Sequence, residues 1–300
     1  MAKTIGVVVL DRITAGLVVD HRLVGPLHAF PDDNGDNDSA LVELHTEALV
    51  KTICQQVIHV AGDHKDIGSI GVGIPGIIRA GVVEDSPNLP QLKGARIAEL
   101  LSNELKAHGL SVHVHMLNDA DGVAAGLAAA QGRLDSLIRV WTLGVGIGFG
   151  RYPFAPGVWE GGHTVVTLED KENYCGCGGR GHIEGIMGHR AMRLRFLDME
   201  PEEVFEEARA GNERCLKFVK LWHKALAAGT ASSIYMDGPG KFLLTGLNVR
   251  FVDLAMLKDY VQQMIKMSPL QSYSIEIVEE NEEMRVIGAA VTAEHSANAR

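Results

Sequence analysis

Cysteine is scarce in this chain of 300 residues, which contains only Cys54, Cys175, Cys177 and Cys215. Two of the four are a single residue apart, so the chain cannot carry a framework of spaced disulfides. Long apolar runs are also missing, and no apolar stretch approaches the length that a membrane-spanning helix needs. A hydrophobic content of 46% nevertheless supports one large core or two modest ones, and it excludes a disordered tail.

Basic residues are fewer than acidic residues in this chain. The chain has 28 lysines and arginines against 38 acidic residues, a formal net charge of −10, which argues against nucleic acid as the main partner. The start of the sequence has neither the charged segment nor the long apolar segment of a secretory signal. We therefore expect a cytoplasmic protein that binds neither a membrane nor nucleic acid.

The first part of the chain alternates between strand and helix patterns. Runs rich in valine and isoleucine predict strands at 4–10, 13–19 and 22–30, and their tight connections indicate an antiparallel meander. The polar run 31–38 predicts a loop, and Ser39 is expected to cap an amphipathic helix at 41–60. A strand at 70–74, a helix at 96–106, a strand at 112–117 and a helix at 120–131 follow.

A second set of elements begins near Ile138. Strands are predicted at 141–150, 164–167, 242–245 and 274–278, and helices at 182–195, 201–210, 212–236, 253–266 and after Arg285. The order favours an α/β fold of two closely packed lobes, 1–133 and 134–300, with a mixed sheet in each. The helix after Arg285 is a candidate to pack back on the first lobe.

The strongest local signal lies between residues 160 and 184, which read Glu160-Gly-Gly-His163 and then Cys175-Gly-Cys177-Gly-Gly-Arg-Gly-His182-Ile-Glu184. His163, Cys175, Cys177 and His182 offer the four nitrogen and sulfur ligands that zinc takes in a tetrahedron. With no position left for water, the zinc would be structural and would hold Glu160 and Glu184 in place. A glycine-rich loop with two incidental cysteines is the alternative.

Asn118 and Asp119 follow the strand at 112–117 and precede a helix. Ligands of open α/β sheets bind at the carboxyl ends of strands, where a carboxylate is well placed to act as a base. Taken alone, Asp119 is predicted to be a helix cap rather than a catalyst.

Two glycine-rich segments carry weaker signals. Gly71–Gly76 with the SPNLP loop at 86–90 would let a ligand approach the backbone, and the turn within 142–148 would cradle phosphate through main-chain amides. A simple tight turn is the commoner role for such a glycine hairpin.

The order of these motifs resembles the ROK family, the bacterial group of sugar kinases and sugar-responsive repressors. The resemblance covers nearly the whole chain and rests on GVGIPG with SPNLP, LNDADGVAAG, LGVGIG, the EGGH…CGCGGRGHIE block and IGAAV. It implies the two-lobed actin/hexokinase-like (ribonuclease H-like) fold and phosphorylation of a sugar. Homodimers are common in the family, so the resemblance also suggests a homodimer.

Residue roles follow from the resemblance position by position. Asp119 would be the general base that takes the proton of the sugar hydroxyl as it attacks the γ-phosphate. His163 would bind both zinc and sugar. The sugar hydroxyls would be hydrogen-bonded by Asn118, Glu160, His163 and Glu184, with Asn88 close by.

The sequence departs from the family pattern on the nucleotide side. Family kinases carry Asp-x-Gly-Gly-Thr between the first two strands, where this chain has Val8-Val9-Leu10-Asp11-Arg12. The Gly-Thr-Gly motif reads Gly144-Val145-Gly146, and the expected glycine triplet reads Thr245-Gly246-Leu247-Asn248. Gly144, Gly146 and Gly246 are the nucleotide-binding positions that remain. His182 replaces a cysteine ligand, and zinc accepts either residue.

Two functions are consistent with this pattern. The first is a glucokinase-like hexose kinase that uses Mg-ATP, with Asp119 as its base. The second is a zinc-stabilised sugar-binding pseudokinase or sensor that has lost ATP binding. A repressor is disfavoured because the chain starts directly with its first strand, without the DNA-binding domain of family repressors.

Overall fold

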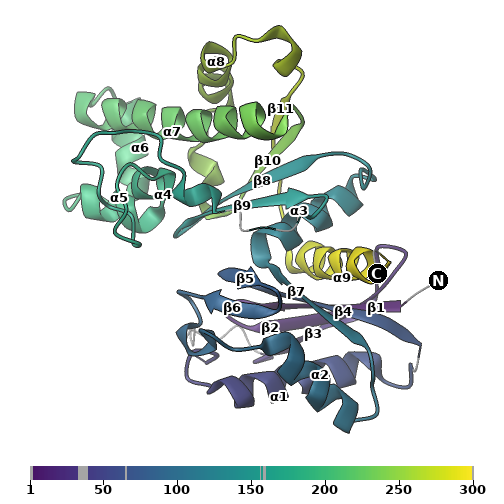
Figure 1. The fold of residues 1–300 in the computed structure, drawn as a ribbon. Coiled ribbons are helices and arrows are strands. Elements are labelled where there is room, and N and C mark those ends of the chain that lie inside the picture. Colours follow the sequence, from purple (N-terminus) through teal and green to yellow (C-terminus); the bar gives the residue numbers. More distant parts are fainter. Residues whose placement is uncertain (1–2, 33–39, 65, 156, 158–159, 299–300) are drawn as a thin grey trace. The chain divides into compact units, whose positions relative to one another are not determined.

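The structure is a computed structural model that describes residues 3–32, 40–64, 66–155, 157 and 160–298 (Figure 1). It divides into two compact units. Unit 1 comprises Met1–Ser136, Gly150–Val158 and Glu280–Arg300, and unit 2 comprises Leu137–Phe149 and Trp159–Glu279. Each unit contains one main sheet, so the α/β class with a mixed sheet in each part is confirmed. The expected Ser39 cap and most of the loop at 31–38 lie outside the described residues.

The sheet of unit 1 has the strand order β3-β2-β1-β4-β7. The strands β1 (Lys3–Val9), β2 (Ile13–Val19) and β3 (Arg22–Phe30) form the predicted antiparallel meander. The strands β4 (Ile67–Ile74) and β7 (His113–Asn118) pair parallel to β1. Because β1, β4 and β7 are parallel, their carboxyl ends meet at one edge of the sheet. A small hairpin of β5 (Ile77–Arg79) and β6 (Val82–Asp85) follows β4.

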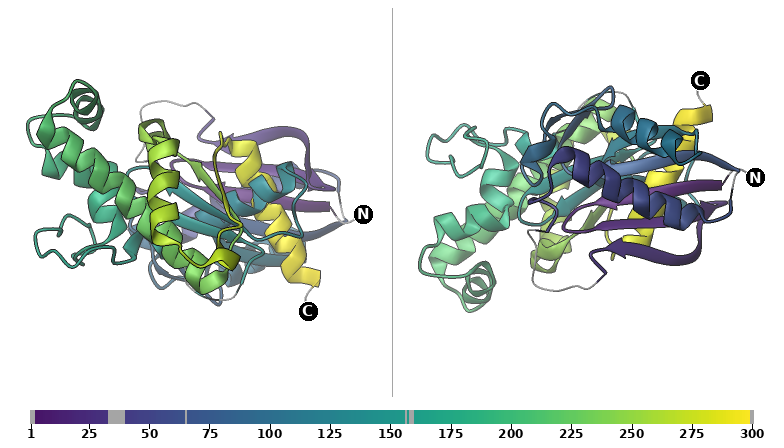
Figure 2. Two further views of the ribbon diagram at one scale, coloured as in Figure 1. Left: turned by 90° about the horizontal axis from the view of Figure 1, so that it is seen from above. Right: turned by 90° about the horizontal axis from the view of Figure 1, so that it is seen from below.

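Helices cover both faces of this sheet. The helices α1 (Thr46–Ala61) and α2 (Ile97–Ala107) bury Ile5, Val7 and Val9 on one face. On the other face, α9 (Glu282–Asn298) packs against Val8 and Val18 and contacts α3 (Asp119–Ala130). The views from above and below show α9, in yellow, on the opposite side of the strands from α1 and α2 (Figure 2). The alternation of Val7 and Val8 between the two cores is the period of two expected for a strand.

Unit 2 is built on a sheet of strand order β11-β10-β8-β9. The strands are β8 (Ile138–Leu143), β9 (Ile147–Tyr152), β10 (Lys241–Thr245) and β11 (Ser274–Ile277). The helices are α4 (Ile183–Met187), α5 (His189–Arg195), α6 (Pro201–Arg209), α7 (Glu213–Asp237) and α8 (Leu254–Met264). Trp141 of β8 and Trp222 of α7 lie in its core. No helix in the described part of the chain is both long and apolar enough to cross a membrane.

Three expected elements differ in the structure. The helix predicted from residue 41 begins at Thr46, because Leu41–Leu44 form a turn. The helix predicted at 182–195 is two helices, since Gly188 is extended and the amide of His189 bonds to the carbonyl of Gly144 at 3.0 Å. The strand predicted at 164–167 is a single bridge between Val165 and His182.

His223 is a fully buried polar side chain in α7. Its Nδ1 lies 2.8 Å from the carbonyl oxygen of Val219, and its Nε2 accepts the amide of Asp253 at 2.8 Å. A ring that accepts at one nitrogen and donates at the other is neutral. Burial lowers the pKa of His223, which agrees with this neutral form.

This histidine should make the stability of unit 2 depend on pH. The pKa of His223 is lower in the folded state than in the unfolded state, where it is about 6.5. The contribution of His223 to stability is therefore complete above that unfolded value and is lost as the pH falls below it. We expect acid to lower the free energy of unfolding by on the order of 1 kcal/mol more in the natural chain than in His223→Gln. Urea unfolding at pH 7.5 and 5.0, followed by fluorescence of the buried Trp141 and Trp222, measures this difference. The control is His45→Gln, which replaces an exposed histidine. If it reduces the pH dependence of the free energy of unfolding as much as His223→Gln does, the assignment is contradicted.

Candidate functional site

The carboxyl end of β7 in unit 1 presents Asn118 and Asp119. Asn118 is the N-cap of α3, since its Oδ1 accepts the amide of Ala120 at 2.9 Å. Its Nδ2 donates to the carbonyl of Gly76 at 2.8 Å, which ties the end of β4 to the start of α3. The prediction that Asp119 is the cap is therefore wrong, because the preceding residue takes that role. Asp119 occupies the first helical position, where a helix dipole favours a negative charge.

Asp119 is surrounded by opposing electrostatic effects. Burial raises the pKa of its carboxyl group, whereas the charge of Arg285 and the amides of Ala120 and Asp119 lower it. Glu280 raises this pKa further by like-charge repulsion. A desolvated carboxyl group under such opposing electrostatic effects is a group placed to exchange a proton.

The turn between β1 and β2 lies at the same edge of the sheet. In this turn the amide of Leu10 bonds to the carbonyl of Arg12 at 3.1 Å. The Nε of Arg12 donates to Glu282 at 2.7 Å, and its Nη2 bonds to the other oxygen of that carboxylate. The side chain of Arg12 thus lies where the family pattern would have glycines.

The glycines of the 71–76 segment have different neighbours. A Cβ atom on Gly71 would lie 1.9 Å from the carbonyl oxygen of Ala289, so this glycine admits α9 and not a ligand. A Cβ on Gly73 would have only Val7 O and the Cα of Asp119 within 4 Å, at 3.8 and 3.9 Å. In the SPNLP loop, Ser86 donates to the carbonyl of Pro75 at 2.6 Å, and Asn88 is exposed. Gly73 is therefore the member of this segment that borders Asp119.

The four predicted metal ligands are brought together in unit 2. The Nδ1 atoms of His163 and His182 are 3.3 Å apart, and the two cysteine sulfurs are 3.4 Å apart. Cys175 lies 3.5 Å from His163, and Cys177 lies 3.3 Å from His182. A tetrahedron with zinc–ligand bonds of about 2.0–2.3 Å has edges of about 3.3–3.8 Å. The observed spacings match these edges, so the cluster can hold a metal ion.

The protonation chemistry of the cluster also suits a cation. Burial lowers the pKa of His182, which favours the neutral ring that coordinates metal. Burial raises the pKa of the Cys175 thiol to about 12. A bound cation would be needed to displace that proton, as metal ions do for thiol ligands.

Two glycines allow the metal loop to close. A Cβ on Gly179 would lie 2.1 Å from the ring of His182. Gly181 has φ +69°, and a Cβ there would lie 1.9 Å from the carbonyl oxygen of Thr167. Side chains at these positions would displace the ligand loop.

Glu160 and Glu184 border the cluster. The Oε1 of Glu184 lies 3.4 Å from Cys175 Sγ, and its Oε2 accepts the amide of Ile147 at 3.1 Å. The Nε2 of His163 faces Glu160 at 3.8 Å, on the side of the ring opposite its ligand nitrogen. Burial raises the pKa of Glu160, with Glu184 adding to the rise and His163 opposing it. Glu160, His163 and Glu184 therefore form one polar group beside the metal loop.

The β8–β9 turn holds Gly144 and Gly146. A Cβ on Gly146 would lie 2.5 Å from a carboxylate oxygen of Glu184, so the turn already receives a carboxylate of its own chain. Gly246 has φ +94° and lies against the backbone of Leu143. Asn248, which is fully buried, links the two segments by donating to the carbonyl of Gly144 at 3.0 Å.

His189 and the helix that it begins were not assigned a role from the sequence. Its Nδ1 lies 3.2 Å from Asn248 Oδ1, and its amide bonds to Gly144. Its ring is thus committed to Asn248 and lies outside the metal cluster. No local pattern identifies this role, because the partners are far away in the sequence.

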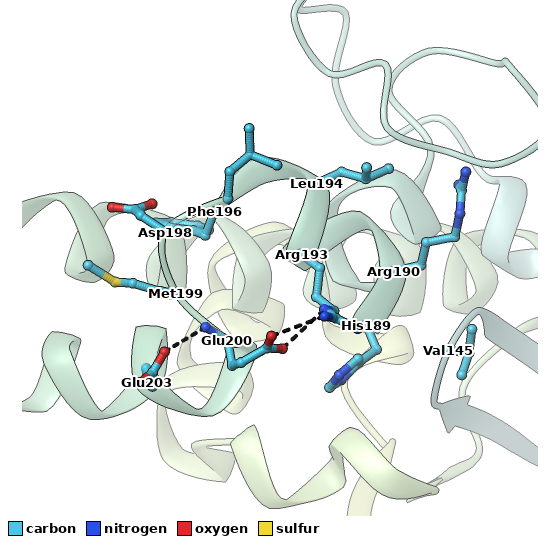
Figure 3. Close-up of a pocket in the computed structure, with 11 residues that line it drawn as sticks. Val145, His189, Arg190, Arg193, Leu194, Phe196, Asp198, Met199, Glu200 and Glu203 are labelled. Atoms are coloured by element: carbon cyan, nitrogen blue, oxygen red, sulfur yellow. Dashed lines mark hydrogen bonds and ion pairs between the residues drawn. The ribbon is translucent and has the colours of Figure 1, made fainter.

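A pocket of about 790 Å³ opens beside this turn (Figure 3). Its lining includes Val145 at the tip of the turn, His189, and the exposed Leu194 and Leu197. Most of its charges are paired within the protein, Arg193 with Glu200 at 3.1 Å and Asp198 with Arg214 at 2.9 Å. Arg190 has no ion-pair partner among the residues that the structure describes, and its guanidinium points away from the Arg193–Glu200 pair (Figure 3). Glu203, whose carboxylate accepts the amide of Glu200 at 2.7 Å, likewise has no ion-pair partner in the described part of the chain, so its charge balances that of Arg190.

Comparisons with known proteins agree with the architecture. The family model described as the ROK family matches residues 42–296. A glucokinase of Pyrobaculum calidifontis is 27% identical over 264 residues, which are 82% of this chain and 79% of that protein. The ROK hexokinase of Thermus thermophilus superposes with a TM-score of 0.78 at 22% identity, covering 99% of this chain and 100% of that one. A ROK family glucokinase of Streptomyces griseus, solved with glucose and AMPPNP, gives 0.65 at 21% identity, covering 98% and 100%.

Proposed function

Because the chain belongs to the ROK family, we propose that it is a sugar kinase that transfers the γ-phosphate of ATP to a hexose hydroxyl. The observation that carries the proposal is Asp119, a carboxyl group at the first position of α3 and the carboxyl end of β7 whose pKa is raised by burial. The glucokinase relative covers most of the chain, which supports a hexose as acceptor.

In the proposed reaction Asp119 is the general base. The sugar oxygen forms a bond to phosphorus, the bond from phosphorus to the bridging oxygen of ADP breaks, and the hydroxyl proton passes to the Asp119 carboxylate. Such proton transfer contributes about 10²- to 10⁴-fold to a rate. The remainder of phosphoryl transfer is positioning and charge stabilisation, for which Mg²⁺ bound to ATP supplies positive charge.

In unit 2, the hydrogen bonds to sugar hydroxyls are assigned to Glu160, His163 and Glu184. In unit 1, the same role is assigned to Asn118 and Asn88. Asn118 uses one oxygen lone pair to cap α3 and one N–H to bond to Gly76. One lone pair and one N–H therefore remain for a sugar hydroxyl. The burial that raises the pKa of Glu160 also strengthens its hydrogen bonds to a bound sugar.

We assign the metal as structural zinc. His163 would then bind zinc through Nδ1 and face Glu160 with Nε2, so the metal would orient a sugar-binding side chain. We expect the purified protein to contain one zinc per chain by mass spectrometry of metals, and Cys177→Ser to lose it.

The matched control for this metal is Cys54→Ala, which removes a buried cysteine of α1 outside the cluster. It should retain the full metal content. Equal zinc content in the natural chain and in Cys177→Ser would rule out the assigned ligand set.

The donor side is assigned to the β8–β9 turn and the adjoining pocket. The pocket has a cation at Arg190 and apolar walls at Leu194 and Leu197, which suits a nucleotide with an anionic end and a flat base. Gly144, Gly146 and Gly246 border the same region through Asn248 and Leu143. These observations favour a donor site despite the divergent motifs.

A sugar-binding pseudokinase is the second candidate, and one observation favours it. Two turns are expected to bind phosphate through main-chain amides, and in each a side chain of the protein occupies the region. Arg12 lies in the β1–β2 turn, and the Glu184 carboxylate lies against Gly146 of the β8–β9 turn. A carboxylate at that turn repels phosphate unless it moves.

Two measurements separate the candidates. Hexoses and N-acetylhexosamines are tested with Mg-ATP for release of ADP, and calorimetry measures binding of glucose and of a non-hydrolysable ATP analogue. Turnover with at least one sugar supports the kinase. Sugar binding without analogue binding or turnover would replace it with the pseudokinase.

A further inference from the structure

The β8–β9 turn of unit 2 is bound by a carboxylate of its own chain. The amide of Ile147 donates to Oε2 of Glu184 at 3.1 Å. A Cβ atom on Gly146 would lie 2.5 Å from the same oxygen, so the carboxylate fits into the space that this glycine leaves open. The turn therefore accepts an anionic oxygen at a main-chain amide, and in this structure Glu184 supplies that oxygen.

Other groups hold the turn independently of this carboxylate. The carbonyl of Gly144 accepts the amide of His189 at 3.0 Å. It also accepts Nδ2 of Asn248 at 3.0 Å, and Asn248 is fully buried. Neither bond involves Glu184, so the turn should keep its shape when the carboxylate leaves Ile147.

Glu184 also belongs to the polar group that is assigned to the sugar. Its Oε1 accepts the thiol of Cys175 at 3.4 Å, and a thiol is a weak donor, so this oxygen can be exchanged readily to a sugar hydroxyl. The segment Glu160–His163 lies against the same residue of the turn, since a Cβ on Gly162 would lie 1.9 Å from the carbonyl oxygen of Ile147. The sugar-binding segment and the phosphate-binding turn therefore meet at Ile147.

We propose that Glu184 couples the binding of the two substrates. Without sugar, its carboxylate occupies the turn, and its charge opposes a phosphate there. A sugar hydroxyl that bonds to Glu184 draws the carboxylate off Ile147, and the freed amide can then donate to a phosphate oxygen. Each substrate binds more tightly once Glu184 is turned to the sugar, so the two bind cooperatively. This inference rests on the proposed kinase function.

The test is Glu184→Gln, whose side-chain oxygen can still accept the amide of Ile147 but carries no charge. Calorimetry measures binding of a Mg-bound, non-hydrolysable ATP analogue, alone and with whichever sugar of the turnover panel binds most tightly. In the natural chain, sugar should tighten analogue binding by about 5- to 150-fold. The variant should bind the analogue without sugar at least about fivefold more tightly than the natural chain does, and sugar should add less than about twofold.

Either of two results overturns the inference. The first is an analogue affinity that sugar leaves unchanged in the natural chain. The second is a Glu184→Gln variant that binds the analogue without sugar no more tightly than the natural chain.

Glu160→Gln is the matched control, because it removes the other carboxylate of the sugar-binding group. The Glu160 carboxylate faces Nε2 of His163 at 3.8 Å, whereas the bond to Ile147 comes from Glu184. This variant should bind sugar more weakly and bind the analogue without sugar as the natural chain does. An equal gain of analogue affinity in both variants would assign the effect to net charge and overturn the inference.

A second readout uses the natural chain. Nitrogen-15 NMR of isoleucine-labelled protein follows the Ile147 amide, and Ile147→Val identifies its signal. Loss of a hydrogen bond to a carboxylate should move the amide proton upfield when sugar is added alone, and an unmoved signal overturns the inference. Absence of ADP release with every sugar would overturn the kinase proposal alone, because the analogue affinities and this signal still decide the role of Glu184.

Discussion

Asp119→Asn is expected to reduce kcat by about 10²- to 10⁴-fold, because an amide cannot accept the hydroxyl proton. The affinity for glucose should change by less than about threefold, since the asparagine keeps an oxygen for hydrogen bonding. ADP release measured in a coupled assay gives the first quantity, and calorimetry gives the second. The substitution also removes a desolvated charge, so the fold should not suffer.

The matched control is Asp121→Asn, two residues along the same helix. The carboxylate of Asp121 accepts the amide of Arg151 at 2.9 Å, and an asparagine oxygen can replace it there. This variant should retain most of its activity. A kinase that survives Asp119→Asn with nearly full activity would show that another group takes the proton.

Gly126→Ala is expected to destabilise unit 1 by roughly 3 kcal/mol or more. Its new methyl group would lie 1.9 Å from the carbonyl oxygen of Met284 and 2.8 Å from the carbonyl carbon. Both atoms are backbone, so no rotamer change relieves the contact, and α3 and α9 must separate. Urea unfolding and hydrogen exchange across α9 measure the loss.

Gly122→Ala provides the control for this prediction. It lies one turn earlier in α3, and its methyl would meet Leu117 at 3.5 Å and Arg285 at 3.9 Å, which are ordinary contacts. Alanine is favoured over glycine in a helix by up to about 1 kcal/mol, so this variant should be neutral or more stable. If the two variants destabilise unit 1 equally, the close approach of α3 and α9 is not the reason for glycine at position 126.

Much of this arrangement could be predicted from the sequence. Hydrophobic periodicity located the meander of unit 1, and Asn212 and Asp253 mark the starts of α7 and α8 as good capping residues do. The metal cluster was predictable because His163, Cys175, Cys177 and His182 combine suitable chemistry with close spacing. These features depend on local sequence.

Other features depend on contacts between distant segments. Gly71 resembles a ligand-binding glycine in the sequence, yet it accommodates Ala289 from the far end of the chain. The run Glu279–Glu283 has the composition of a solvated turn, but Glu280 in it is largely buried against Arg285. Nothing in either local pattern specifies the partner, so only the folded chain identifies these roles.

The order in which the ribosome releases the chain gives α9 a particular place in folding. Unit 2 ends at Glu279 and is interrupted only by Gly150–Val158, so all of its residues emerge before α9 does. Unit 1 begins the chain, but Gly6 and Gly71 on its sheet receive the backbone of Val286 and Ala289. The core of unit 1 is therefore completed only after the residues of unit 2 and then α9 have been synthesised.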